Sequence, residues 1–276
     1  MGFFDLFRGR RRDDEPDAPR ERPTVPASVT VIPRASRPGN LGALPEGLPA
    51  GEFVFAEQGD EPIAWLARGK DLRALWARLV ADFPATGLWP VVGHLFTTTE
   101  VHRWLEREFD GPDFTIRPVE DVLRAGLWTT EIYPPDDPAD AWRYTFAGLA
   151  QGTFDGGAVT LPTPDQVTAL VLVPVTRPAD VAAQLGWVGA GNYELTGGDV
   201  TAVLRSWEDR FGMVVTNMES DTLLVTVATP PTDPAQAELL AREWYAFCPD
   251  AIDQGVDDLD ALAEVAIHDT WYFWWD

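Results

Sequence analysis

Five aspartates in residues 250–260 are the side chains whose type and spacing come closest to a metal-binding or reactive centre. Carboxylate oxygens are the ligands that calcium and magnesium require. The chain offers them at Asp250, Asp253, Asp257, Asp258 and Asp260. Their spacing lacks the alternating ligands, central glycine and distal glutamate of a calcium-binding loop. We therefore expect no metal ion and no cofactor, and we predict that two of these aspartates cap the last helix.

Cys248 is the only thiol of the chain. A reactive thiolate needs a helix N-terminus or a cationic neighbour, whereas Cys248 falls at the predicted C-terminus of a helix, in an acidic segment. We predict a buried, inert thiol and assign no catalytic residue. A single cysteine also excludes an intramolecular disulfide and favours a reducing compartment, so we expect the protein in the cytoplasm.

A recognition surface is another use that the charged and aromatic residues suggest. On one predicted helix, Trp207 faces the core of the protein, whereas Glu208 and Arg210 point elsewhere. If the loops of the C-terminal part converge, they would form one binding surface with these two residues. The candidates are Trp187, Tyr193, Glu208, Arg210, Asp221, Asp250, Gln254 and Trp274. The alternative is a helix face that is only solvated.

A carboxylate-based enzyme is the rival hypothesis. It would use Glu208, Asp221 and Asp250, which lie near predicted loop ends, as general acid or base. The glycine motifs that bind dinucleotides or phosphates are missing, as is the nucleophile elbow of hydrolases. The sequence therefore favours a binding protein without naming an activity.

The charge of the chain limits its partners. The formal net charge is -23, and the C-terminal part is the most acidic. Such a surface repels a phosphate backbone, so nucleic acid is not an expected ligand. A protein partner, which could be basic as for toxin-neutralising immunity proteins, is the leading hypothesis. The oligomeric state stays open.

The first twelve residues suggest a weak membrane contact as a further alternative. Phe3, Phe4, Leu6 and Phe7 stand beside four arginines, and such a short amphipathic turn could touch an anionic lipid surface. No run of about 18 apolar residues occurs that would cross a membrane.

The composition divides the chain into four parts. Residues 1–50, rich in Pro and charge after the basic start, predict a disordered arm. Residues 51–150 alternate short strands with amphipathic helices and predict an N-terminal α/β region. Residues 151–167 predict a linker or long loop, and residues 168–276 predict a C-terminal α+β domain. Whether the two larger parts share one sheet is open.

The terminal aromatic run predicts how the architecture closes. Trp271, Phe273 and Trp275 would line one face of a strand, and Tyr272 and Trp274 the other. Strands that are apolar on both faces usually lie inside a sheet covered by helices. We therefore predict an α+β fold, or mixed α/β, with helices packed on a mixed sheet that contains this C-terminal strand.

Several short motifs of the C-terminal part resemble one family. They are Leu172-Val-Pro-Val175, Arg177-Pro-Ala-Asp180, Gly186-Trp187, Leu204-Arg-Ser-Trp-Glu-Asp-Arg-Phe-Gly212, Phe247-Cys-Pro-Asp250 and Phe273-Trp-Trp-Asp276. Over about residues 168–276 the chain is similar to a bacterial domain-of-unknown-function family, number 4253. Thr86-Gly-Leu-Trp-Pro90 resembles the upstream region of its longer members. The resemblance implies a fold neighbourhood and brings no established activity.

Overall fold

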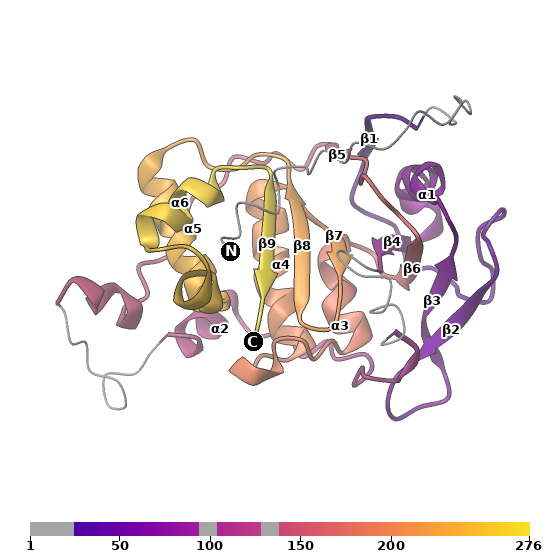
Figure 1. Cartoon of the computed structure of the whole chain (residues 1–276), viewed down its shortest axis with the longest axis horizontal. Coiled ribbons are helices and arrows are strands. Elements are labelled where there is room, and N and C mark those ends of the chain that lie inside the picture. The colour runs from indigo at the N-terminus through magenta and orange to yellow at the C-terminus, as the bar shows by residue number, and fades with distance from the viewer. Residues whose placement is uncertain (1–24, 94–103, 128–137) are drawn as a thin grey trace, which may run out of the picture.

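The computed structural model describes residues 25–93, 104–127 and 138–276, and all structural statements concern those residues. One seven-stranded sheet runs across the molecule in Figure 1, in the order β2, β3, β6, β4, β7, β8, β9. The strands are β2 (Gly51–Phe55), β3 (Pro62–Arg68), β4 (Leu88–Val92), β6 (Ala169–Pro174), β7 (Met213–Met218), β8 (Thr222–Val227) and β9 (Thr270–Trp274). The predicted α+β fold with a mixed sheet is confirmed.

Strands from both halves of the chain alternate in this sheet. β6 comes from the C-terminal part, yet it pairs antiparallel with β3 on one side and with β4 on the other. β4 in turn lies parallel to β7, whereas the other neighbouring strands are antiparallel. Residues 51–150 and 168–276 therefore share one sheet, which answers the question that the sequence left open.

The α-helices are α1 (Arg73–Thr86), α2 (Val119–Ala125), α3 (Val181–Leu185), α4 (Gly197–Phe211), α5 (Pro234–Phe247) and α6 (Leu259–Ala266). In Figure 1, α3 and α4 lie behind the sheet, while α5 and α6 stand beside its β9 end. Short turns among the described residues include the 3-10 helices η3 (Pro138–Tyr144), η4 (Pro178–Asp180) and η5 (Gly191–Tyr193) and the π-helix η6 (Ala251–Gly255).

Local sequence signals explain where the main helices begin and end. The Thr196 hydroxyl accepts a hydrogen bond from the Asp199 N–H, and the Asp199 carboxylate accepts one from the Thr196 N–H, so a capping box starts α4. Gly212 ends α4 with a φ of 66°, a conformation that costs glycine little. Asp258 caps α6 by accepting from the Ala261 N–H. Of the five clustered aspartates, it is the one that caps this helix.

A two-stranded sheet departs from the expected organisation. β1 (Ser28–Val31) pairs antiparallel with β5 (Val159–Pro162). β1 falls in the predicted disordered arm, and β5 falls in the predicted linker. Each strand has four residues and lies near prolines, so the composition of these segments did not reveal a pairing between residues 130 positions apart. The arm is thus tied to the body from Ser28 onward, and β1 packs against α1.

β9 lies at the edge of the large sheet and pairs with β8. Trp271, Phe273 and Trp275 are buried, whereas Tyr272 and Trp274 on the other face stay partly exposed. Membership of the sheet is confirmed, and β9 closes the sheet at its edge with one face buried and the other partly covered. The buried face packs on α4 and α5, because the Phe273 ring stacks on Trp207 and lies 4.5 Å from Trp244, centroid to centroid.

Two predictions from the sequence concern membranes. No helix in the described part of the chain is long and apolar enough to cross a membrane. Phe3, Phe4, Leu6 and Phe7 lie outside the described residues, so their membrane contact stays a prediction.

Candidate functional site

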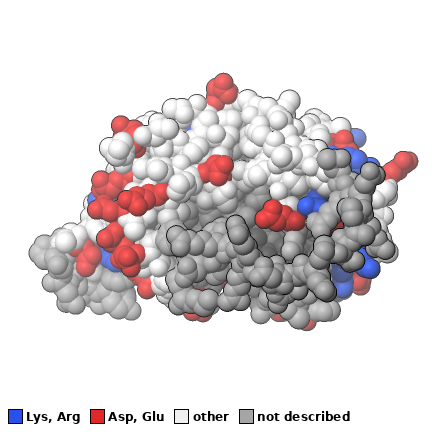
Figure 2. Space-filling model, turned by 45° about the horizontal axis from the view of Figure 1, so that its top comes forward, with Lys and Arg blue, Asp and Glu red and all other residues white. Residues whose placement is uncertain are grey.

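One cleft among the described residues is acidic. Its volume is about 720 Å³, and six of its lining residues are acidic whereas one, Arg107, is basic. The acidic residues are Glu57, Glu106, Glu108, Asp110, Asp221 and Asp276. All six are exposed. More widely, Figure 2 shows Asp and Glu scattered over the drawn face and Lys and Arg mainly near one end.

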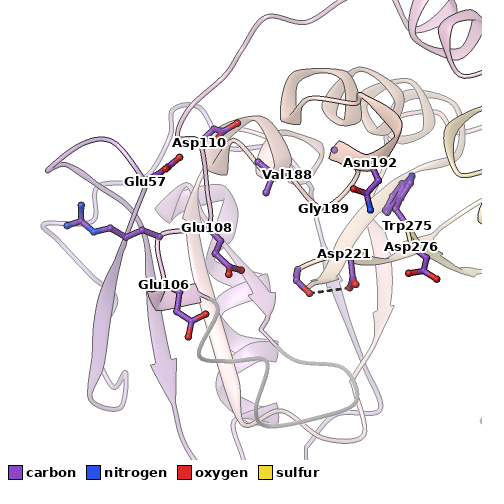
Figure 3. Close-up of a pocket in the computed structure, with 13 residues that line it drawn as sticks. Glu57, Glu106, Glu108, Asp110, Val188, Gly189, Asn192, Asp221, Trp275 and Asp276 are labelled. Atoms are coloured by element: carbon purple, nitrogen blue, oxygen red, sulfur yellow. Dashed lines mark hydrogen bonds between the residues drawn. The ribbon is translucent and has the colours of Figure 1, made fainter.

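Two walls face each other across this cleft (Figure 3). One wall carries Glu57, which follows β2, and Glu106, Glu108 and Asp110. The other wall carries Asn192 of η5, Asp221 of the β7–β8 turn and the last two residues, Trp275 and Asp276. Val188 and Gly189 lie between the walls. Carboxylates therefore stand on both sides of the opening.

Backbone hydrogen bonds fix the first wall. The Glu57 N–H donates to the Phe109 carbonyl at 2.7 Å, and the Asp110 N–H donates to the Gly186 carbonyl at 3.0 Å. Within the same wall Arg107 adopts a left-handed backbone with φ 57°. A non-glycine residue in this region costs about 1–3 kcal/mol, so the neighbouring contacts must hold the segment in place.

Close packing fixes the floor of the cleft near Gly189. A Cβ added at Gly189 would lie 2.1 Å from the Trp187 ring and 2.3 Å from the Ser220 carbonyl oxygen. The Trp187 indole N–H donates to the Glu219 carbonyl at 2.7 Å, and its ring lies 5.4 Å from that of Trp275. Trp187, one of the predicted binding residues, is therefore a buried support beneath the cleft.

Asp250 joins the second wall from behind. Its side chain accepts hydrogen bonds from the Tyr193 hydroxyl at 2.6 Å, the Gln254 side-chain amide at 2.9 Å and the Asp276 N–H at 2.9 Å. Burial, followed by the contact with Asp250, raises the pKa of Tyr193, so the phenol stays protonated and donates. The structure thus brings together three predicted residues, Tyr193, Asp250 and Gln254.

Asp221 and Trp274 also lie near this wall. The Asp221 side chain lines the cleft, and its backbone carbonyl accepts from the Trp275 N–H at 3.1 Å. The Trp274 ring packs against Gly255, since a Cβ there would lie 2.6 Å from the indole. Trp274 itself does not line the cleft.

Glu208 belongs to a different network and does not join the predicted recognition surface. Its buried carboxylate lies between Arg177 and Arg34, with 2.7 Å to the Arg34 guanidinium. Asp209 pairs with the same two arginines. These contacts join α4 to the segment after β1 and to the loop after β6, so Glu208 is a structural anchor.

Arg210 is likewise separate from the cleft. Its guanidinium pairs with buried Glu243 of α5 at 2.6 Å and donates to the Ala150 carbonyl at 2.7 Å. The Trp207 indole N–H donates to the same Glu243 carboxylate at 3.0 Å. Arg210 therefore neutralises a buried acid between two helices. The helical pattern correctly placed Trp207 inward, but it could not show what the next turn would contact.

Cys248 has the surroundings of an inert thiol. It follows the last residue of α5, is fully buried and donates to the Trp274 carbonyl. Burial raises its pKa well above that of a free thiol, which opposes thiolate formation. Nor do the described residues contain a group of three or more His, Cys, Asp or Glu that could hold a metal ion.

The wall formed by residues 104–110 was missed from sequence. The sequence predicted short strands and amphipathic helices for residues 51–150, and residues 94–103 lie outside the described part. Glu106, Glu108 and Asp110 carry no motif. They line a cleft because a distant segment around Gly186 and Gly189 packs beside them. No local signal in the sequence reports such a contact.

The comparisons with known proteins bear on the C-terminal part. The model of a family described as "Domain of unknown function (DUF4253)" matches residues 169–276, which confirms the resemblance for that part. No curated protein and no solved structure matches the chain. The matched segment contributes one wall and the floor of the cleft, whereas Glu57 and residues 106–110 lie outside it.

Proposed function

We propose that the protein is a non-catalytic interaction module whose acidic cleft receives a basic segment of a protein partner in the cytoplasm. The observation that carries this proposal is the pair of facing walls with six acidic residues against one arginine. Opposite charge speeds association and selects among partners.

The shape of the cleft supports a side-chain ligand. Its volume of about 720 Å³ falls within the usual range of ligand pockets. Carboxylates on both walls would let one arginine or lysine side chain meet acids on two sides. Guanidinium groups form forked hydrogen bonds with carboxylates, so arginine suits such walls best.

A carboxylate enzyme has less support from this geometry. Of its three proposed residues, Asp221 lines the cleft, Asp250 lies behind the wall and Glu208 is paired elsewhere. General acid and base groups must reach one substrate together. These three side chains share no cleft among those of the described residues.

Binding of a labelled hexa-arginine peptide, measured by fluorescence anisotropy at low salt, tests the proposal. Hexa-glutamate serves as the negative peptide. Replacing two facing acids, Glu108→Gln with Asp221→Asn, should weaken binding about fivefold to thirtyfold, because each exposed ion pair contributes up to about 1 kcal/mol.

A second double variant distinguishes the effect of the cleft acids on binding from the effect of the overall negative charge. Asp260→Asn with Glu264→Gln removes the same charge from exposed positions of α6. It should change the affinity less than about twofold, since distant exposed charges are screened by salt. Equal weakening by both pairs, or no binding by the unaltered protein, would contradict a cleft-specific site.

A further inference from the structure

Asp250 is a buried carboxylate that three separate segments contact. Its exposed fraction is 2%. The donors are Tyr193 at the end of η5, Gln254 within η6 and the backbone of Asp276 after β9. A buried charge is costly unless hydrogen bonds satisfy it, and here both carboxylate oxygens have partners.

Two of these segments form the second wall of the cleft. Tyr193 directly follows Asn192, and Asn192 and Gly191 line the cleft. Asp276 also lines it. Asp250 itself does not, so it contacts the wall from the protein side. The carboxylate thus ties the η5 turn to the last residues of the described chain.

The backbone beside Tyr193 needs such a tie. Glu194 has a φ of 58°, and with Arg107 it is one of the two non-glycine residues with positive φ in the described ranges. Surrounding contacts must hold a residue in this conformation. The Tyr193–Asp250 hydrogen bond lies next to it and is short, at 2.6 Å.

We propose that Asp250 is a positioning residue of the cleft: its hydrogen bonds to Tyr193 and Asp276 set the spacing of the wall that carries Asn192 and Asp276. The inference rests on the proposed function of this cleft as the binding site. Asp250 acts without touching the ligand. The wall is built before the partner arrives, which limits the entropy lost on binding.

Variants at both ends of the hydrogen bond test this role. Asp250→Asn should weaken hexa-arginine binding about tenfold, because the loosened wall must then be ordered when the peptide binds. Tyr193→Phe keeps the ring and removes only the hydroxyl, so it should weaken binding in the same direction and keeps the test open if Asp250→Asn fails to fold.

The salt dependence of binding separates positioning from direct contact. The slope of log Kd against log salt reports the charges that meet the peptide. It should stay unchanged in Asp250→Asn and decrease in Asp221→Asn, which removes a lining charge. Asp253→Asn is the matched control, because Asp253 lies on the same η6 turn but pairs with Arg143 away from the cleft.

Hydrogen exchange gives a readout that needs no ligand. Amides of residues 188–194 and 274–276 should exchange faster in Tyr193→Phe than in the unaltered protein, with the central strands unchanged. Unaltered exchange in these segments, unaltered affinity in both variants, or a slope that falls as in Asp221→Asn would each overturn the inference. If the unaltered protein binds no peptide, the proposed function fails, and the exchange result alone decides the positioning role.

Discussion

Glu208 shows what burial does to a single charged side chain in this fold. Burial raises the pKa of Glu208 to about 7, against the opposing effects of Arg177 and Arg34. A carboxyl group in the unfolded chain titrates near 4.5, so the folded protein binds this proton more tightly. The stability gained from that proton is fully present below about pH 4.5 and is lost as the pH rises through about 7.

A pH series on Glu208→Gln checks this effect. Between pH 4 and pH 8, the free energy of unfolding of the unaltered protein should fall by about 3 kcal/mol relative to the variant, because each unit of pKa shift corresponds to about 1.4 kcal/mol. Urea denaturation at each pH gives the values, with the exposed Glu264→Gln as control. Parallel curves for the protein and Glu208→Gln would mean that burial does not raise the Glu208 pKa.

The site residues show how far single positions could be predicted. Tyr193 and Gln254 both donate hydrogen bonds to the Asp250 carboxylate. Glu208 and Arg210 were expected on the same surface, yet each pairs inside the protein. Helical periodicity reports which side of a helix is apolar. It does not report which distant arginine or glutamate will meet its polar side.

Among the elements, β9 depends most on aromatic packing. Phe273 is fully buried against Trp207, Trp244 and Phe247. Phe273→Ala should therefore destabilise the protein by about 3–5 kcal/mol, the range for removing a buried phenylalanine. Urea unfolding measures this loss, and Tyr272→Ala, on the half-exposed face of the same strand, is the control. Equal losses would contradict the burial of one face.

Elements with strong patterns were predicted, and those that depend on remote partners were not. The aromatic spacing of 271–275 predicted a strand with Trp271, Phe273 and Trp275 on one face, because side chains alternate along a strand. The same pattern could not show that β9 takes the edge position, because side-chain alternation does not report how many strands pair with it. β1 and β5 were missed because each has only four residues and lies in a segment whose prolines predict loops.

At the scale of the whole molecule, the alternation of strands should make unfolding a single event. β4 separates β6 from β7, so residues 169–276 alone contain β6 without the strand that joins it to the rest. A fragment of residues 168–276 should lose the native sheet, which near-ultraviolet circular dichroism of its tryptophans would show. A native-like spectrum for the fragment would contradict this dependence; adding back residues 25–127 is the complementary control.

The same strand order has a consequence during synthesis on the ribosome. All five residues of β4 are buried in the finished protein, yet its parallel neighbour β7 supplies the contact of Val92 with Asn217, 125 residues later. Until that neighbour is translated, a fully apolar strand remains with an open side on the growing polypeptide. We therefore expect nascent chains of this protein to bind chaperones between the synthesis of β4 and the synthesis of β7. A pause in translation between these two strands should prolong the time during which the nascent chain can aggregate.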